Sequence, residues 1–307
     1  MKTTLIHHSA DFDGLFCREI ARKFLPEAEL IGWDFGDKPL DIPPEGQIYI
    51  LDLPVDRVFG DEFSGKATTK YFCNDDMLKR VVWIDHHKTS IESHPENIAG
   101  YRIDGVAACR LAWQWFTCED GFIDKRRDPE LLPEKRTFVE RGVKEPLAVR
   151  LAGEYDIWDK RDPRAEVFQF GLRSRVLTSG WWYDLLSSKS EIYCDTLLEA
   201  GQMLQRYQQA QDASIMHRSF MVWFHGLRFL VLNTARCNSL TFASFDGDET
   251  GHDALMGFYW TGKAWKVSLY HAKHRTDIDL SEIAVKCGGG GHRGACGFET
   301  YSLPFVP

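Results

Sequence analysis

The segment Arg80–Thr89 constrains the fold of this chain most strongly. Its apolar residues Val81–Ile84 are followed directly by Asp85, His86 and His87. A short apolar, β-branched run is typical of a buried strand in a parallel sheet. Ligands and catalytic groups in open α/β sheets lie beyond the carboxyl ends of the strands. The segment therefore predicts an α/β fold in which Asp85, His86 and His87 lie at a functional edge.

Two other apolar runs also end next to acidic or imidazole side chains. A lone Asp-His-His could be structural, since a histidine at a strand end often only satisfies a neighbouring carbonyl. However, Thr3–Ile6 and Gln47–Leu51 also read as strands. A helical segment at 146–152 leads to a further carboxylate. The side chains that follow these segments are His7, Asp11 and Asp13 after the first, Asp52 after the second, and Asp156 after the helix.

The residue types in this set favour a hard divalent metal. Carboxylate oxygens and neutral imidazoles suit Mn²⁺ or Mg²⁺ better than a thiophilic metal, and no cysteine belongs to the set. Two such ions about 3.5–4 Å apart can share a carboxylate and stabilise an in-line displacement at phosphorus. The set is large enough for two ions, and it predicts a two-metal site for phosphoester chemistry.

The same residues resemble a known family. His7-x3-Asp11-x-Asp13-Gly14, Asp52, Asp85-His86-His87 and Asp156 are similar to the four motifs of the DHH superfamily of phosphoesterases. Gly288–Ala295, which reads Gly-Gly-Gly-Gly-His-Arg-Gly-Ala, resembles the GGGH motif of the DHH-associated C-terminal domain. The motifs occur in the family's order over nearly the whole chain. The nanoRNase and oligoribonuclease branch, which cuts very short oligonucleotides, is the most similar in appearance.

The resemblance implies roles for individual residues. Asp52 would bridge two Mn²⁺ ions, with Mg²⁺ or Co²⁺ as possible substitutes. His87 would contact the scissile phosphate or assist the leaving oxygen, and Asp85 would orient a histidine. The implied metal ligands are His7, Asp11, Asp13, Asp52, His86 and Asp156, and the implied catalytic residues are Asp85, His86 and His87.

The glycine run is the expected substrate-binding element. Successive glycines let a backbone approach a ligand closely and point several N–H groups at one anion. The residues expected to bind substrate are His87, Gly289, Gly290, Gly291, His292 and Arg293. Many family members carry an arginine in the preceding strand, where this chain has Ser268–His271. Phosphate contact there could pass to His271, Lys273, His274 or Arg275, or Tyr270 could stack on a base.

Length and patterning predict two domains. With 307 residues and 44% hydrophobic content, the chain can bury two cores. We expect a DHH catalytic domain at 1–188 with a mostly parallel sheet, a linker helix at 189–220, and a smaller α+β substrate-binding domain at 221–307, with the active cleft between the domains. The polar stretch 119–146 reads as a connection. Helices are expected at 14–25, 105–116 and 279–286, and a hairpin is expected around Trp260–Lys263.

Charge and composition limit the classes of molecule that the chain is expected to bind. A net charge of −8 disfavours long nucleic acid, whose binding depends mainly on phosphate neutralisation by Lys and Arg. We expect no membrane span and no signal peptide, because no apolar stretch reaches membrane-spanning length and the first residues read as a strand. Eight scattered cysteines without a CxxC pair indicate thiols in a reducing compartment. We expect a cytoplasmic monomer or homodimer that binds short RNA or dinucleotides and no membrane.

These observations together predict a Mn²⁺-dependent phosphodiesterase. It would hydrolyse linear dinucleotides, such as pGpG from cyclic di-GMP turnover, and very short oligoribonucleotides to mononucleotides. The nearest alternatives are a cyclic-dinucleotide phosphodiesterase and a 3′-phosphoadenosine 5′-phosphate phosphatase. A polyphosphate or pyrophosphate hydrolase fits less well, because such sites tend to be rich in Lys and Arg. A nucleotide sensor without activity is the alternative outside enzymes.

Overall fold

The computed structural model describes residues 2–41, 43–59, 79–93, 98–117, 144–159, 161–235, 237–243, 251–303 and 305. The chain divides into two compact units, Met1–Leu204 and Gln205–Pro307. The boundary lies within the long helix α11 (Ser190–Met216), where the sequence predicts a linker helix. Most of the expected polar connection at 119–146 lies outside the described residues.

The first unit contains a parallel sheet of four strands in the order β2-β1-β3-β4. The strands are β1 (Thr3–His8), β2 (Glu29–Trp33), β3 (Gln47–Leu51) and β4 (Val81–Ile84). An extended segment lies beside β4, where the Trp83 N–H donates to the Ala99 carbonyl at 2.7 Å. Because all four strands run in the same direction, their carboxyl ends meet at one edge, as the sequence predicts.

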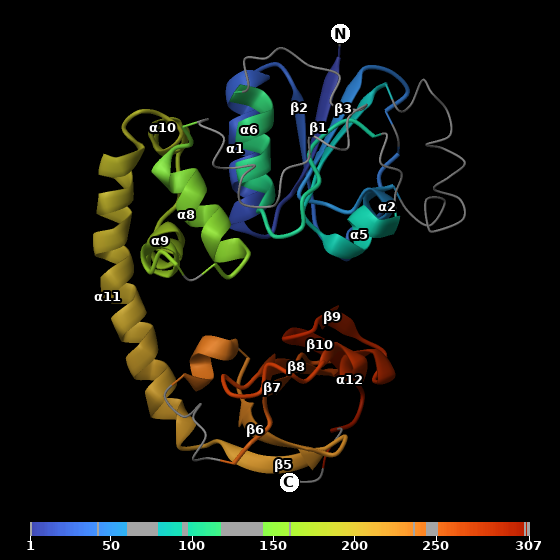
Figure 1. The fold of residues 1–307 in the computed structure, drawn as a ribbon, viewed down its shortest axis with the longest axis vertical. Coiled ribbons are helices and arrows are strands. Elements are labelled where there is room, and N and C mark those ends of the chain that lie inside the picture. Colours follow the sequence, from blue (N-terminus) through green and yellow to red (C-terminus); the bar gives the residue numbers. More distant parts are fainter. Residues whose placement is uncertain are drawn as a thin grey trace. The chain divides into compact units, whose positions relative to one another are not determined.

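Helices cover both faces of this sheet (Figure 1). α1 (Phe12–Phe24) and α6 (Ala108–Thr117) pack on one face, and α2 (Val55–Val58) lies on the other. α5 (Lys88–Ser93) follows the histidine pair. The first unit also contains α8 (Leu147–Asp156), α9 (Arg164–Arg173) and α10 (Ser179–Leu185).

Side-chain alternation along the strands produces two cores. Neighbouring residues in a strand point to opposite faces, so Leu5 and Ile6 enter different cores. Leu5 packs in the core that includes Phe16 and Phe168, whereas Ile6 packs with Trp83. The sheet is therefore buried on both faces, which explains its nearly continuous apolar strands.

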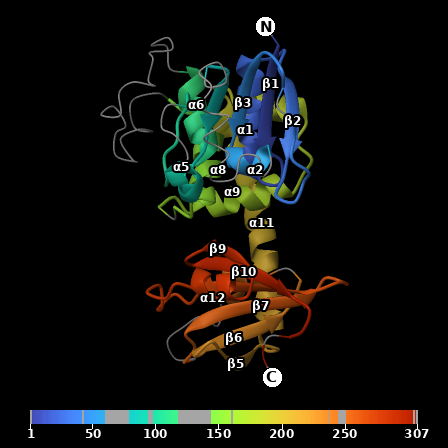
Figure 2. The same ribbon diagram turned by 90° about the vertical axis from the view of Figure 1, so that its right-hand side faces the viewer.

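The second unit is built on a sheet of six strands in the order β5-β6-β7-β8-β10-β9. Its strands are β5 (Phe220–Phe224), β6 (Leu227–Asn233), β7 (Ala254–Trp260), β8 (Trp265–His271), β9 (Gly290–His292) and β10 (Ala295–Thr300). β6 and β7 are parallel, and the other pairs are antiparallel. α12 (Ser281–Lys286) packs on one face through Ile283 and Ala284. Figure 2 shows the helix beside the strands of this sheet. The end of α11 and a 3₁₀ helix (Ser239–Phe242) pack on the other face.

Three details differ from expectation or add to it. The predicted linker helix extends to 220, but α11 ends at Met216 and the aromatic run Phe220–Phe224 forms β5. The six cysteines in the described part of the chain are all free thiols. Among the described helices, none combines the length and apolar character needed to cross a membrane.

Candidate metal centre

The first corner of the candidate site is formed where β1 meets α1. Asp11 caps α1 by accepting the Gly14 N–H at 2.9 Å. A Cβ at Gly14 would lie 2.1 Å from the His8 carbonyl oxygen, so only glycine lets the helix start this close to the strand. In this arrangement Asp11 Oδ2 lies 2.9 Å from His8 Nδ1. The strand end and the helix cap thus deliver one imidazole and one carboxylate to the same point.

Replacing Gly14 with alanine should open this corner. The added methyl group would overlap the β1 backbone, so α1 must move away from His8 and carry Asp11 and Asp13 with it. We expect Mn²⁺ affinity to fall by at least about tenfold, similar to the loss of a supporting contact around a metal ligand. Calorimetric titration with Mn²⁺ measures this. Gly180→Ala, at an exposed position in α10 with no contact closer than 3.9 Å, is the matched control and should keep wild-type affinity.

His8, not His7, lies with the carboxylates. The motif spacing predicts His7 as a ligand, but its Nδ1 lies 2.7 Å from the His8 carbonyl oxygen and its ring is buried. Burial lowers the pKa of His7 to about 4. Consecutive strand residues point to opposite faces, so only one histidine of the pair can reach the edge where Asp11 lies. Alternation along β1 and the His-His doublet indicate this choice, but they leave open which of the two is used.

Asp52 occupies the centre of the edge. It follows β3 in the left-handed region with φ of 59°, a conformation that aspartate tolerates better than most residues. Its N–H donates to the Ile84 carbonyl at 2.9 Å. Its Oδ2 lies 3.4 Å from His8 Nδ1, and its Oδ1 lies 3.3 Å from His86 Nε2. Asp52 therefore contacts both imidazoles, which is the placement expected of a shared ligand.

The second group of ligands surrounds His86. Its Nε2 lies 3.3 Å from Asp156 Oδ2 and 3.7 Å from Asp13 Oδ2. Asp156 is the last residue of α8. The buried Asp13 carboxylate accepts the N–H groups of Ala108 and Cys109, at 2.9 and 2.8 Å, where α6 begins. Two helices distant in the sequence, α1 and α8, therefore place carboxylate oxygens around the imidazole that Asp52 also contacts.

Asp85 and His87 form a separate pair beside these ligands. Asp85 is fully buried, and its Oδ1 accepts the His86 N–H at 2.8 Å. The same oxygen lies 2.7 Å from His87 Nδ1. This contact fixes the orientation of the His87 ring, whose pKa is raised because the Asp85 carboxylate outweighs the effect of burial. Asp85 thus contacts one nitrogen of the His87 ring, and its role in orienting a histidine stays a prediction.

Two histidines of the site compensate part of the negative charge of its carboxylates. Burial disfavours an imidazolium, but carboxylates overcome it and raise the pKa of His8 to about 11 and that of His86 to about 10. Burial and the charges of Asp52 and Asp11 raise the pKa of Asp156 to about 6. Burial also acts on Asp52, but His8 and His86 lower its pKa to about 2. Without metal, two protonated imidazoles thus compensate part of the clustered negative charge.

Metal binding should therefore compete with protons. A metal ligand must be a neutral imidazole or a carboxylate, so ions binding at His8 and His86 would release their protons. We expect Mn²⁺ affinity to rise with pH between 6 and 9, and to fall further below pH 6 as Asp156 takes up a proton. Titrations in buffers of different ionisation enthalpy count the protons released. An affinity independent of pH would contradict the imidazole ligands.

The arrangement fits divalent cations. Within the described residues, three groups place one ligand atom each within 4.8 Å of one another; these are His8, Asp11, Asp52; Asp13, His86, Asp156; and Asp52, His86, His87. His8 Nδ1 and Asp52 Oδ2 are buried and make no well-directed hydrogen bond within the described part of the chain. Buried nitrogen and oxygen atoms in this condition are suited to a hard cation. The groups share Asp52 and His86.

The glycine run of the second unit is more ordered than its composition suggests. Gly288 ends α12 with φ of 83°, and its N–H donates to the Val285 carbonyl at 3.0 Å. The Gly289 N–H donates to the Ala284 carbonyl at 2.8 Å. Gly290, Gly291 and His292 form β9 and pair with β10. The run is thus a helix cap followed by an edge strand, and the N–H of Gly289 already has a partner.

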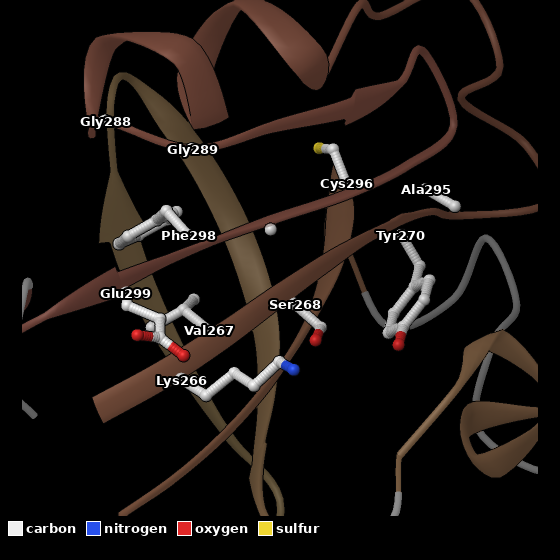
Figure 3. A pocket seen from close by; sticks show the side chains of 11 residues that line it. Lys266, Val267, Ser268, Tyr270, Gly288, Gly289, Ala295, Cys296, Phe298 and Glu299 are labelled. Atoms are coloured by element: carbon white, nitrogen blue, oxygen red, sulfur yellow. The ribbon is translucent and has the colours of Figure 1, made fainter. Parts of the chain in front are cut away.

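A pocket of about 640 Å³ lies beside the glycine run (Figure 3). Gly288 and Gly289 border it together with Lys266, Ser268 and Tyr270 of β8. The residues considered as substitutes for the missing arginine have partners of their own. His271 Nε2 lies 2.6 Å from the Ile278 carbonyl oxygen, and Arg275 pairs with Asp253 and Asp277. Arg293 donates to the Asp277 carbonyl.

Comparison with solved structures identifies the fold. No protein-family model matches the chain, and no curated protein matches it in sequence. The DHH domain of a member of the S1p family of ribosomal proteins is similar at 14% identity, over 98% of this chain and 83% of that one, with a TM-score of 0.51. The pGpG-specific phosphodiesterase PggH from Vibrio cholerae is similar at 14% identity, over 98% of this chain and 94% of that one, with a TM-score of 0.48. Exonuclease RecJ bound to manganese is similar at 12% identity, over 97% of this chain and 86% of that one, with a TM-score of 0.48.

The first of these similarities exceeds a TM-score of 0.5. It spans both units of this chain, whose parallel sheet and second mixed sheet agree with the architecture that the sequence predicts. The predicted fold is therefore confirmed.

Proposed function

The chain has the fold of the DHH superfamily, and from that premise we propose that it is a metal-dependent phosphodiesterase. The observation that carries the proposal is the arrangement of imidazole and carboxylate ligands in groups that share Asp52 and His86. Two divalent ions that share a carboxylate are suited to in-line displacement at phosphorus. A structural site for one ion would not need overlapping groups.

The ligands divide between two positions. His8, Asp11 and Asp52 would hold one ion, and Asp13, Asp52, His86 and Asp156 would hold the other. Mn²⁺ is the proposed ion, with Mg²⁺ or Co²⁺ as substitutes. When bound, the ions would supply Lewis acidity toward a phosphoryl oxygen and lower the pKa of a water molecule.

His87 is the proposed residue for contact with the scissile phosphate. Its Nδ1 faces Asp85, so its Nε2 is the nitrogen left to donate to a phosphoryl or leaving oxygen. The raised pKa of His87 favours the protonated ring that such donation needs. In the second unit, His292 and Arg293 stay candidates for substrate binding.

Short linear substrates are the proposed class. The net charge of −8 gives a long polyanion little to bind, while bound cations would make the site itself attractive to one or two phosphates. The motifs most resemble those of the nanoRNase branch. We therefore propose linear dinucleotides, such as pGpG, and very short oligoribonucleotides, hydrolysed to mononucleotides.

A matched substrate panel tests this assignment. Purified protein with Mn²⁺ is incubated with pGpG, pApA, a five-nucleotide RNA, cyclic di-GMP and 3′-phosphoadenosine 5′-phosphate, and the products are separated by chromatography. Rapid loss of both dinucleotides with slow loss of the pentamer supports the proposal. Preference for the cyclic substrate or for the monophosphate moves the assignment to those activities. Chelation with EDTA should abolish turnover, and added Mn²⁺ should restore it.

A further inference from the structure

A large apolar side chain lies exposed beside the candidate metal centre. Phe35 follows β2, and 52% of its surface is accessible. Its ring centre lies 5.7 Å from that of His8 and 6.4 Å from that of His87, with interplanar angles of 76° and 69°. Phe35 therefore contacts the proposed ligand on one side and the proposed phosphate-binding histidine on the other.

The backbone holds Phe35 in this place. The Phe35 N–H donates to Asp34 Oδ1 at 2.7 Å, and the Asp34 N–H donates to Asp37 Oδ2 at 2.8 Å. Asp34 Oδ1 also lies 3.2 Å from His8 Nε2. The turn that carries the phenyl ring is thus tied to the site through a shared carboxylate.

A second exposed aromatic residue follows the ligand Asp156. α8 ends in a Schellman motif, in which the Asp159 N–H donates to the Glu154 carbonyl at 2.8 Å and the Trp158 N–H donates to the Tyr155 carbonyl at 3.0 Å. Trp158 occupies the left-handed position of this motif with φ of 55°, where glycine is usual. A bulky residue at positive φ is strained. The indole is 46% exposed, and its ring centre lies 5.6 Å from that of Tyr155.

An exposed aromatic ring beside the proposed phosphate-binding histidine, as Phe35 is, suits a substrate that carries bases. Inorganic phosphate chains offer nothing for a ring to stack on, whereas every nucleobase has a π-face. We infer that Phe35 and Trp158 position nucleobases of the substrate and make the site select nucleotides over phosphate compounds without a base. This inference deepens the proposed function and rests on it for the location of the phosphate.

Binding of a product-like ligand tests the inference separately from turnover. Calorimetry with Mn²⁺ present compares GMP with ribose 5-phosphate, which has the same phosphate and sugar but no base. We expect the full-length protein to bind GMP at least about tenfold more tightly, as base–aromatic stacking predicts. Phe35→Ala should lose most of this preference, and Phe35→Trp should keep it. Equal affinity for the two ligands, or a full preference in Phe35→Ala, overturns the inference.

Two further variants separate stacking from structure. Trp158→Gly places the usual residue in the left-handed position, so its thermal stability should equal or exceed that of the wild type while its affinity for GMP falls. An unchanged preference for GMP in this variant removes Trp158 from the inference. Tyr183→Ala is the control. Tyr183 is an exposed aromatic residue of α10 beside Lys23, at the opposite end of α1 from Asp13, and its loss should leave the preference intact.

The two proposals fail in different ways. Absence of pGpG hydrolysis with a retained preference for GMP contradicts the proposed activity and supports base recognition. Hydrolysis of pGpG with equal affinity for GMP and ribose 5-phosphate contradicts base recognition and supports the proposed activity.

Discussion

Asp52→Asn is expected to lower kcat/KM for pGpG by at least about a hundredfold, the scale of losses seen when a metal ligand is no longer properly held. Asp52 contacts both His8 and His86, so neither position keeps its full set of ligands without the carboxylate. Asparagine has nearly the same shape and also tolerates the left-handed backbone of this position. Steady-state kinetics at saturating Mn²⁺ measures the loss, and circular dichroism verifies the fold.

Asp195→Asn provides the matched control for that variant. Asp195 is exposed on α11, and its replacement with asparagine removes the same charge by the same chemical change. It should retain wild-type turnover. If Asp52→Asn also retains turnover at saturating Mn²⁺, the model of a shared carboxylate is wrong.

The second large effect is expected from the histidine doublet. His8→Asn should lower Mn²⁺ affinity by about tenfold to a hundredfold, because it removes an imidazole that lies 2.9 Å from Asp11 and 3.4 Å from Asp52. His7→Asn removes a ring outside the ligand groups of the described residues, so its effect on Mn²⁺ affinity should be much smaller. Its buried position makes a loss of thermal stability the main result.

Titration with Mn²⁺ and thermal unfolding of both variants rank the two histidines directly. The reverse order, with His7→Asn losing the metal and His8→Asn keeping it, would restore the ligand that the motif spacing predicts.

Much of the first unit can be predicted from the sequence because its strands are short apolar runs with polar residues at their ends. Gln47–Leu51 and Val81–Ile84 are strands as expected, and the parallel order brings Asp52 and His86 together. The hairpin of β7 and β8 also follows from patterning and turn residues. Such signals are local, and the buried parallel sheet reinforces them.

The remaining features depend on information that patterning lacks. A period of two describes a strand without fixing which residue faces the site, so His7 and His8 cannot be distinguished from their spacing. Asp34 contacts His8 from a turn 26 residues away. Aspartate is common in turns, so the sequence does not distinguish this residue from turn aspartates that contact no functional site. The glycine run permits many conformations, and its ordering as a cap and a strand depends on packing against β10.

The Asp13 carboxylate joins residues 95 positions apart in the chain through the Ala108 N–H. Local opening of the start of α6 would release this carboxylate, so loss of a metal ligand and local unfolding would be the same event. The amide protons of Ala108 and Cys109 should therefore exchange with solvent more slowly when Mn²⁺ is bound. Hydrogen exchange at two backbone positions would then report occupancy of the metal centre without any measurement of catalysis.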